Sequence, residues 1–441
     1  MGTGLFGKNS GGIKVPHRKM SDKKMIEGAS LPKVVTVPMG QHLGAPAKPL
    51  VKKGDVVKTG QLIAEPGGFI SANIHAPISG TVKKLVIMLN VVTSKPMEAI
   101  VIESDGRDEW SLMPKMDDWR SRPKEEVLQR IKGAGIVGLG GATFPTHVKL
   151  SPPPGKKIDT IIINGCECEP YITSDHRVMM EYGEKVIKAI PILQWLLDCN
   201  NVFFAIEKNK PDAIQHITDL IAKHGVKGVR VASMKTKYPM GAEKTLTKSL
   251  LGREVPMGSL PLDVGVVVQN VSTVIAIHDA IYDGKALVER VVTVTGNVKV
   301  PKNLMARFGT PAVELVESCG GVVGDADEII FGGPMMGISQ PNLNSPTTKG
   351  TNCILVKKAP DVEERDCFRC SSCIDACPMN LMPTMYVLLA KKSRWEDCET
   401  LYYVNNCVEC GSCAYVCPAK IPLVQYIKTA KLEYRKLGVK K

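Results

Sequence analysis

The chain has 441 residues, 44% of them apolar, which is enough for two to four domains with cores of their own. Its formal net charge of +13 suggests nucleic acid, but no nucleic-acid-binding motif occurs, so we expect no such partner. There is no apolar run of about 18 residues and no apolar leader, which predicts a cytosolic protein that docks on membrane complexes at most.

Basic residues gather near both ends of the chain, at 14–24 and 431–441. Two interpretations stay open for them. They form either a surface for an acidic partner or anionic lipid, or a solvated surface without a partner. We treat residues 1–31 as an N-terminal extension and residues 431–441 as a basic tail.

Residues 32–115 are predicted to form a small all-β module. Turn residues such as Gly54, Gly60 and Gly67 separate short apolar strands at hairpin-like intervals. The pattern resembles the biotinyl/lipoyl carrier fold, a flattened barrel sandwich. A carrier needs a lysine at its hairpin tip, and none occurs between Gly67 and His75. We therefore expect a structural or docking module without a swinging arm.

The next segment, 120–285, alternates between helical and strand patterns. Apolar strands are expected at 157–165, 201–207, 227–234 and 263–270, with amphipathic helices between them. This alternation predicts a doubly wound parallel α/β domain. Ligands of such sheets bind beyond the carboxyl ends of the strands, where Asn164, Tyr238 and Asn270 stand.

The letters GAGIVG at 133–138 match the G-x-G-x-x-G of a dinucleotide-binding turn, and Asp159 follows about twenty residues later. That turn must follow a strand and open a helix. Here a helical pattern precedes the glycines, and a loop with Pro145 follows them. We therefore interpret the match as accidental.

Residues 286–340 read as a small α+β unit, 341–358 as a linker, and 359–430 as a cysteine-rich domain.

The chain has 14 cysteines, which is high for a reducing compartment, so metal is a better explanation than disulfides. Two runs share the spacing C-x2-C-x2-C-x3-C-P of bacterial ferredoxins with two [4Fe–4S] clusters, a spacing that zinc ribbons lack. In that pattern the fourth cysteine of each run reaches the other cluster. The predicted ligand sets are Cys367, Cys370, Cys373 and Cys417, and Cys407, Cys410, Cys413 and Cys377.

Four further segments carry a resemblance to a known family: GLGGATFPTHVK (138–149), NGCECEP (164–170), YPMGAEKTL (238–246) and VVVQNVSTV (266–274). They resemble the flavin- and NADH-binding segments of the NADH-oxidising subunit of respiratory complex I. Over essentially the whole chain, the closer resemblance is to the RnfC family, whose members belong to the Rnf electron-transport complexes. The chain departs from the complex I pattern at Leu139, Cys166 and Ala242, which stand for an arginine, an aspartate and a glutamate.

The resemblance implies a multidomain α/β fold. Its parts are the barrel-sandwich module, an FMN/NADH-binding domain at 120–285, a β-grasp (SLBB-like) domain at 286–340 and a helical two-[4Fe–4S] ferredoxin-like domain at 359–430. The implied cofactors are FMN and two [4Fe–4S] clusters, with NADH as substrate. Glycine backbone would approach FMN closely. The cofactor-binding residues carried over are Gly138, Gly140, Gly141, Phe144, Lys149, Asn164, Glu167, Glu169, Tyr238, Gly241, Glu243, Asn270 and Thr273.

The implied function is oxidation of NADH through FMN and the clusters, with electrons passing to the membrane and iron–sulfur subunits of an Rnf-type complex. Such a complex links NAD and ferredoxin to Na⁺ or H⁺ translocation, and this subunit would sit peripherally on the cytoplasmic side of the bacterial cell membrane. Two alternatives stay open. One is a cobalamin reductase of bacterial microcompartments, and the other is a non-catalytic electron-relay or docking subunit.

Overall fold

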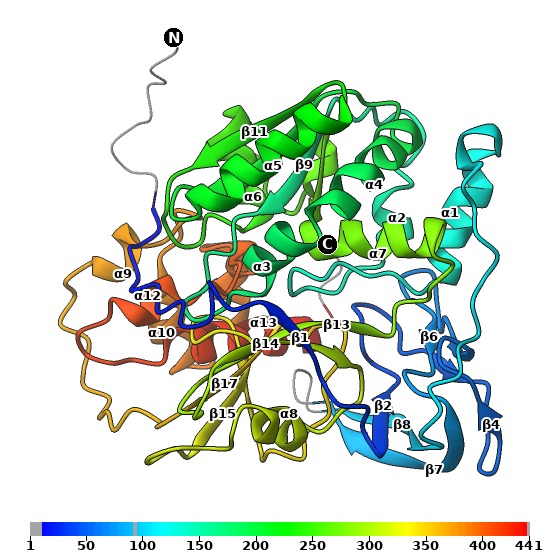
Figure 1. The fold of residues 1–441 in the computed structure, drawn as a ribbon. Helices are drawn as coiled ribbons and strands as arrows, with labels where there is room; N and C mark the ends of the chain where they lie inside the picture. The colour runs from blue at the N-terminus through cyan, green and yellow to red at the C-terminus, as the bar shows by residue number, and fades with distance from the viewer. Residues whose placement is uncertain (1–10, 91–94, 439–441) are drawn as a thin grey trace.

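The computed structural model describes residues 11–90 and 95–438 and packs them into four units (Figure 1). In Figure 1 the α/β unit lies at the top, and the sheet that contains β13, β14 and β17 lies below it. The blue barrel and the orange-to-red helical unit flank that sheet on opposite sides. The expected multidomain fold class is confirmed, and no helix in the described ranges is long and apolar enough to cross a membrane.

The barrel consists of two antiparallel sheets packed around apolar side chains. One has the strand order β2-β8-β7-β4, with bounds Val34–Pro38, Pro96–Ser104, Gly80–Leu89 and Val56–Val57. The other has the order β3-β5-β6, with bounds Lys48–Pro49, Leu62–Glu65 and Ile74–His75. Val37, Ile63 and Ile102 are fully buried between the sheets. Short apolar stretches such as the buried Ala99–Ile102 of β8, bounded by turn residues, explain why the sequence pattern predicts these strands.

The α/β unit contains a parallel sheet of order β11-β10-β9-β12, with bounds Val229–Met234, Val202–Glu207, Thr160–Gly165 and Val266–Asn270. Its helices are α1 (Lys124–Gly133), α2 (Thr146–Lys149), α3 (Ser174–Glu181), α4 (Gly183–Leu196), α5 (Pro211–His224), α6 (Glu243–Leu251) and α7 (Val271–Tyr282). Short 3-10 turns occupy Trp119–Ser121 and Pro261–Val264. The chain order reverses between β9 and β12, so a ligand crevice is expected at their carboxyl ends.

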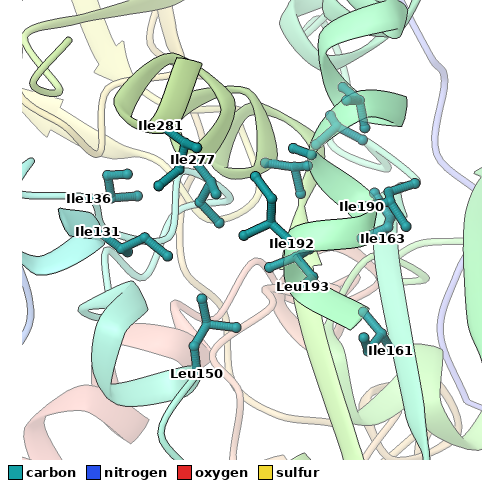
Figure 2. Packing of buried hydrophobic residues seen from close by; sticks show 14 of the residues in the cluster. Ile131, Ile136, Leu150, Ile161, Ile163, Ile190, Ile192, Leu193, Ile277 and Ile281 are labelled. Carbon is teal, nitrogen blue, oxygen red and sulfur yellow. The ribbon is translucent and has the colours of Figure 1, made fainter. Parts of the chain in front are cut away.

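The core of this unit lies between the sheet and helices α1, α4 and α7 (Figure 2). Ile131 of α1, Ile192 of α4 and Ile277 of α7 are fully buried and converge on Ile161 and Ile163 of β9. Burying such side chains stabilises the fold by about 1.5–3 kcal/mol each, so this cluster holds the strand ends in place. The glycines at 133–138 begin at the last residue of α1, which agrees with the interpretation of GAGIVG as no Rossmann turn.

The next unit is a mixed sheet of order β1-β14-β13-β17-β15-β16 with one packed helix, α8 (Ala312–Ser318). The strands run over Ile26–Gly28, Lys302–Arg307, Glu289–Gly296, Cys353–Lys357, Glu328–Phe331 and Ile338–Gln340. The structure differs from the linker expected at 341–358, because β17 pairs with both β13 and β15 inside the sheet. The N-terminal extension also contributes, since β1 pairs in parallel with β14.

The helical unit contains α9 (Ser372–Asp375), α10 (Pro383–Ala390), α11 (Trp395–Thr400), a 3-10 turn at Val404–Asn406, α12 (Ser412–Tyr415) and α13 (Leu423–Lys436). Each cysteine run has the same order, a loop, a short helix and then a longer helix. The tail expected from residue 431 begins inside α13, where Lys431 and Tyr434 are buried. Its last residues, 439–441, lie outside the described ranges.

Residues 11–25, here called the N-terminal strap, connect these units. The strap runs as a dark-blue segment between the α/β unit and the helical unit before it enters β1 (Figure 1). The Gly12 amide donates to the carbonyl of Ala376 at 2.9 Å, and the Ile13 amide donates to the carbonyl of Tyr238 at 2.8 Å. The strap therefore touches the α/β unit and the cysteine-rich domain at the same point.

Candidate flavin and iron–sulfur sites

The glycine loop, residues 138–145, is a closed turn above the amino end of α7. The Gly138 amide donates to the Phe144 carbonyl at 2.8 Å, and the Leu139 amide donates to Thr273 Oγ1 at 2.8 Å. Thr273 is fully buried, so its hydroxyl fixes the loop from below. The sequence pattern assigns Thr273 to a phosphate, whereas in the structure its hydroxyl supports the loop that would approach the cofactor.

Two glycines of this loop leave room for a ligand. A Cβ atom on Gly140 would lie 3.3 Å from the Cβ of Asn270, and Gly141 has a φ of +128°, which side chains rarely adopt. Within the described part of the chain, no protein acceptor bonds the amides of Gly140 and Gly141. Free backbone donors on a loop without side chains are the features that a flavin phosphate or ring needs.

The two asparagines at the carboxyl ends of β9 and β12 organise the loops around this crevice. Asn164 donates to the Gly241 carbonyl at 2.9 Å and accepts from the Cys166 amide at 3.1 Å. Asn270 caps α7 by accepting from the Ser272 amide at 2.9 Å. Both asparagines are half-buried at the strand ends. The structure thus brings Asn164, Gly241, Asn270 and the glycine loop together at the crevice between β9 and β12.

Lys149 and Glu243 form an ion pair across the same crevice. Lys149 also donates to the Val268 carbonyl at 2.7 Å, which ties α2 to strand β12. The Glu243 side chain keeps 41% of its surface exposed, so its carboxylate is open to a ligand from solvent. Phe144, in the glycine loop just before α2, is half-buried. These residues are accessible, as a nicotinamide-nucleotide contact requires.

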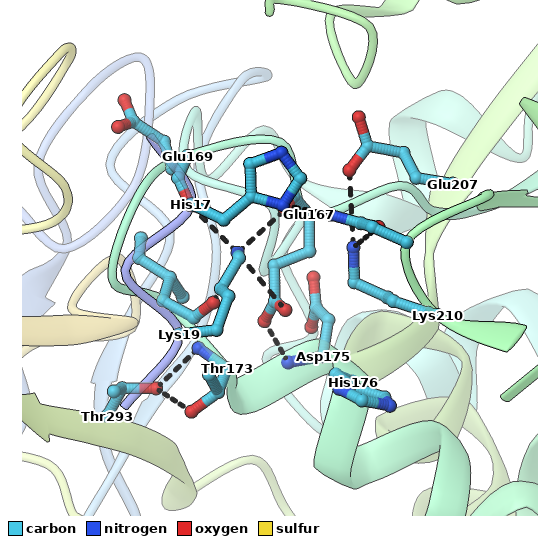
Figure 3. A network of polar contacts seen from close by, with 12 residues as sticks. His17, Lys19, Glu167, Glu169, Thr173, Asp175, His176, Glu207, Lys210 and Thr293 are labelled. Atoms are coloured by element: carbon cyan, nitrogen blue, oxygen red, sulfur yellow. Dashed lines mark hydrogen bonds and ion pairs between the residues drawn. The ribbon is translucent and has the colours of Figure 1, made fainter. Parts of the chain in front are cut away.

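Glu167 and Glu169 lie deeper than the sequence suggests (Figure 3). Glu167 accepts from the Asp175 amide at 2.6 Å and lies 3.6 Å from the ammonium of Lys19. Glu169 accepts from the amides of Met335 and Met336 at 3.3 and 2.8 Å. Burial raises the pKa of each carboxyl to about 7. Glu169 therefore links the α/β unit to the turn before β16, and it does not face open solvent.

Two buried cations support the glycine loop from outside its own domain. Arg290, at the start of β13, donates to the Leu139 carbonyl at 2.9 Å and to the Lys349 carbonyl at 2.6 Å. The ammonium of Lys349 donates to the carbonyls of Asn73 at 2.8 Å and Gly135 at 2.7 Å. Burial lowers the pKa of Lys349 to about 7 and that of Arg290 to about 10. The barrel, the α/β unit and the mixed sheet meet at this pair.

The second cysteine run surrounds a cavity with the last cysteine of the first run. Cys377, Cys407, Cys410 and Cys413 line one small pocket together with Leu381 and Tyr386. Burial, and then the neighbouring thiols of this cavity, raise the pKa of Cys413 above its usual range. Four sulfur donors in an apolar shell fit a [4Fe–4S] cluster, which binds thiolates. We call this the inner cluster site.

The remaining four motif cysteines form a more exposed group, here called the outer cluster site. Cys367 and Cys370 are exposed, Cys373 is half-buried and Cys417 is buried. Burial raises the pKa of Cys373, and the nearby thiols of Cys417 and Cys367 raise it further. Ser372 Oγ lies 3.4 Å from the Cys370 sulfur, as Ser412 Oγ lies 3.4 Å from the Cys410 sulfur. The two runs therefore repeat the same local geometry at different depths.

Tyr238 lies between the flavin crevice and the inner cluster site. Its hydroxyl donates to the Cys410 carbonyl at 2.7 Å, and the residue is 2% exposed. The same hydroxyl lies 3.4 Å from Glu169, and burial first and then this carboxylate raise the pKa of the phenol. The contact joins the α/β unit to the helical unit without intervening solvent.

Family comparisons agree with this arrangement. Residues 131–279 match the Nuo51 FMN-binding domain, 8–107 the RnfC barrel sandwich hybrid domain, 291–339 the SLBB domain and 366–421 the 4Fe-4S dicluster domain. An FMN-binding domain joined to a dicluster domain defines an electron-transfer oxidoreductase subunit, whose cofactors are FMN and [4Fe–4S] clusters.

Two curated relatives identify the family within this class of oxidoreductase subunits. The chain is 47% identical to the C subunit of a proton-translocating ferredoxin:NAD(+) oxidoreductase complex from Clostridium ljungdahlii, covering 87% of this chain and 84% of the relative. It is 40% identical to the C subunit of a Na(+)-translocating ferredoxin:NAD(+) oxidoreductase complex from Acetobacterium woodii, covering 89% and 90%. The chain therefore belongs to the RnfC family of ion-translocating oxidoreductase complexes.

Other relatives differ in length or only share the fold. The C subunit of an ion-translocating oxidoreductase complex from Pseudomonas aeruginosa is 41% identical over 85% of this chain, which spans 49% of that longer protein. Among solved structures, an NAD+-reducing [NiFe]-hydrogenase in the air-oxidized state aligns with a TM-score of 0.51 and 17% identity. That alignment covers 70% of this chain and 63% of the hydrogenase chain, and it shows a shared fold alone.

Sequence reasoning misses the residues that hold these sites from a distance. Lys19, Asp175, Arg290 and Lys349 all make buried contacts around these sites, yet none lies in a cysteine or glycine motif. The sequence groups Lys19 with a basic surface, although its ammonium donates to backbone carbonyls inside the protein. The one sequence signal for the burial of Lys19 is that its stretch continues into strand β1, and this signal is weak.

Proposed function

We propose that this chain is the NADH-oxidising subunit of a membrane-associated Rnf-type complex. In this proposal electrons pass from NADH through FMN and two [4Fe–4S] clusters to membrane and iron–sulfur partner subunits. The complex would link NAD and ferredoxin to Na⁺ or H⁺ translocation, with this chain bound peripherally on the cytoplasmic side. The relatives named for ferredoxin:NAD(+) oxidoreductase complexes support this assignment.

The observation that carries the proposal is that one short segment contacts both sites. Its Tyr238 donates to the Cys410 carbonyl, and its Gly241 accepts from Asn164 at the end of β9. Bound FMN exchanges an electron pair with a hydride donor and single electrons with clusters, each of which carries one. The protein's own part is to position these groups and to keep water out between them. Tyr238 and Cys410 do so with a buried hydrogen bond of 2.7 Å.

Each group of residues has a separate task in this proposal. The glycine loop, with Asn164, Gly241 and Asn270, would hold FMN against the ends of β9 and β12. Phe144, Lys149 and Glu243, at the accessible side, would receive the nicotinamide nucleotide. Glu167 and Glu169 would contribute to the cofactor site from its buried side. The two cysteine sets predicted from the sequence would ligate the inner and outer clusters.

The exposure of the outer cluster site supports its role as the point where electrons leave the chain. Cys367 and Cys370 are exposed, and Phe368 between them keeps 62% of its surface in solvent. An iron–sulfur partner can therefore approach this cluster closely, whereas the inner site is closed by the strap and by the turn before β16. The proposed order of transfer is crevice, inner cluster, outer cluster and partner.

The test is anaerobic mixing of the purified, cofactor-loaded chain with NADH. We expect the flavin absorbance to bleach first and the cluster absorbance to fall afterwards, with NADPH and cob(II)alamin as control reactants. If dithionite reduces both cofactors while NADH reduces neither, the chain is a relay or docking subunit and the proposal is wrong. Preferred turnover of cob(II)alamin over dye acceptors would instead identify a cobalamin reductase.

A further inference from the structure

A separate cavity of about 430 Å³ lies beyond the carboxyl ends of β9, β10 and β11, on the side away from the glycine loop. The strap forms one wall with Lys14, His17 and Lys19, and the strand ends form the other with Glu167 and Glu207. The cavity is lined by polar and charged side chains, and it is large enough for several waters. Tyr238 also lines it, so the cavity borders the proposed electron path without being one of its cofactor sites.

Glu167 places one unpartnered oxygen at this cavity. Its side chain is only 3% exposed, and its Oε1 atom accepts from the Asp175 amide at 2.6 Å. The other atom, Oε2, has no hydrogen-bond partner among the described residues, and its nearest cation is Lys19 Nζ at 3.6 Å. A buried carboxylate oxygen without a donor is costly, so it needs a proton or a water from the cavity.

The other face of Glu167 leads towards the glycine loop through Asp175 (Figure 3). The Asp175 carboxylate accepts from Asn270 Nδ2 at 2.7 Å and from Ser272 Oγ at 2.8 Å. Asn270 in turn packs against Gly140 of the glycine loop. Asp175 therefore stands between the glycine loop and Glu167, with its carboxylate on Asn270 and its backbone amide on Glu167.

Other acids near the cavity are already engaged. Glu207 pairs with Lys210 at 3.2 Å, and Glu169 accepts from two backbone amides. The charged groups that face Glu167 are Lys19 of the strap, Lys210 before α5 and Asp175 of α3. Burial raises the pKa of Glu167 to about 7, while the two lysines oppose that shift. Its carboxyl therefore exchanges protons near neutral pH, which suits a carrier.

We propose that Glu167 carries a proton from the crevice to the strap cavity and so to solvent. The inference rests on the proposed function, because NADH oxidation leaves a proton behind. One C–H bond of NADH breaks, and its hydride brings two electrons and one proton into the site. The electrons leave singly through the two clusters. One proton per NADH remains, binds Oε2 of Glu167 and passes to cavity water.

The first experiment follows proton release from the cofactor-loaded chain with a pH-indicator dye, after NADH and then an outer-cluster oxidant are mixed in. We expect the wild type to release one proton per NADH as the clusters reoxidise. Glu167→Gln keeps the acceptor for the Asp175 amide, and each variant's proton release is timed against its own flavin bleaching. We expect this delay to lengthen about 100-fold in Glu167→Gln. Glu207→Gln, on the same cavity, is the matched control and should release protons at the wild-type rate.

A second experiment needs neither NADH nor FMN. Infrared titration of the FMN-free chain should show two buried carboxyls that titrate near pH 7, those of Glu167 and Glu169. The Glu167 part of the signal should be lost in Glu167→Gln, and the full signal should be retained in Glu207→Gln. Lys19→Gln keeps donors for the carbonyls of Glu167, Glu169 and Ile172 but removes the nearest cation, so the midpoint should move upwards. Melting temperature and circular dichroism verify that each variant is folded.

The outcomes separate the two proposals. If NADH does not bleach the wild-type flavin, the proposed function fails, whatever the infrared titration shows. If NADH bleaches it and Glu167→Gln releases protons as fast as the wild type, the proton-carrier role is overturned. A carboxyl signal of undiminished amplitude in Glu167→Gln, or a midpoint that does not respond to Lys19→Gln, also overturns it.

Discussion

Two buried cations, Arg290 and Lys349, connect domains that lie far apart in the sequence. Arg290 and Lys349 lie 3% and 0% exposed, and both direct their charge at backbone carbonyls rather than at carboxylates. Charged groups are seldom buried unless they satisfy several acceptors. Their positive charge also lies next to the loop assigned to the anionic FMN, which gives them an electrostatic as well as a structural effect.

Replacement of Arg290 by glutamine tests this support. The variant loses the charge-assisted bond to the Leu139 carbonyl, and such bonds contribute about 1.5–3 kcal/mol, so FMN affinity should fall at least about tenfold. FMN content per chain and fluorescence titration measure the change. Arg230→Gln, which removes an exposed arginine of β11, is the control and should bind FMN normally. Equal affinities in both variants would refute a role for Arg290.

Site residues that stand at a fixed spacing can be predicted from the sequence. Site residues that come from a distant part of the chain cannot. The cysteine runs and the strand-end asparagines identify themselves, because ligands and turns need those side chains at those intervals. The environment of Glu167 depends on Lys19, which precedes it by 148 positions. No local pattern encodes such a pairing, so the burial of Glu167 and Glu169 cannot be predicted from the sequence.

Among the secondary-structure elements, the parallel strands and their helices are predicted correctly because each has its own apolar period. β1 and β17 are missed for a physical reason. β1 is short and largely exposed, and β17 follows a segment rich in proline, asparagine and threonine that resembles a linker. Strand pairing, rather than local propensity, makes them strands. The buried pattern of Cys353, Ile354 and Leu355 shows how completely the sheet covers β17.

The boundary near residue 340 can be tested by truncation. A chain that ends at 340 loses β17 and Lys349, so the mixed sheet is split and the glycine loop loses its support. We expect it to melt without cooperativity and to lose FMN. A chain that ends at 358 loses the same cluster domain but keeps both features, so it is the matched control. Cooperative melting of both chains at one temperature would contradict the central place of β17.

The strap offers a second test among the elements. A Cβ on Gly11 would lie 2.4 Å from the Cys377 carbonyl oxygen, and the residue has a φ of +46°. Gly11→Ala should therefore displace the strap and expose the amides of Gly12 and Ile13 to hydrogen exchange. Gly54→Ala imposes backbone strain at a φ of +93°, but nothing lies within 4 Å of its Cβ. Protection of the strap amides should be lost in the first variant and retained in the second.

Across the whole molecule, the two cluster sites differ in depth, and in the proposed electron path this difference favours transfer from the inner site to the outer site. The inner site is closed off beside Tyr238, and the outer site presents Cys367 and Cys370 to solvent. Clusters that exchange electrons with partners need exposure, while those that connect to a flavin need shielding. The arrangement of the four units meets both needs in one chain.

Cys370→Ser is expected to remove the outer cluster. Iron content should fall by about half, since two clusters become one. The inner cluster should remain reducible, while transfer to a protein acceptor should stop. Cys398→Ser changes a buried cysteine outside both runs and should leave the iron content as it was. Unchanged iron in Cys370→Ser would show that the ligand assignment is wrong.

The strap also sets an order of events during biosynthesis. It is translated before its hydrogen-bond partners, because Tyr238 and Ala376 follow it by hundreds of residues. Closing so long a loop is entropically costly until both partners have folded. The strap is thus the last piece to dock, after the ribosome has released the cysteine-rich domain. Until then Cys377 stays uncovered on that side, which leaves an opening for the machinery that delivers iron and sulfide.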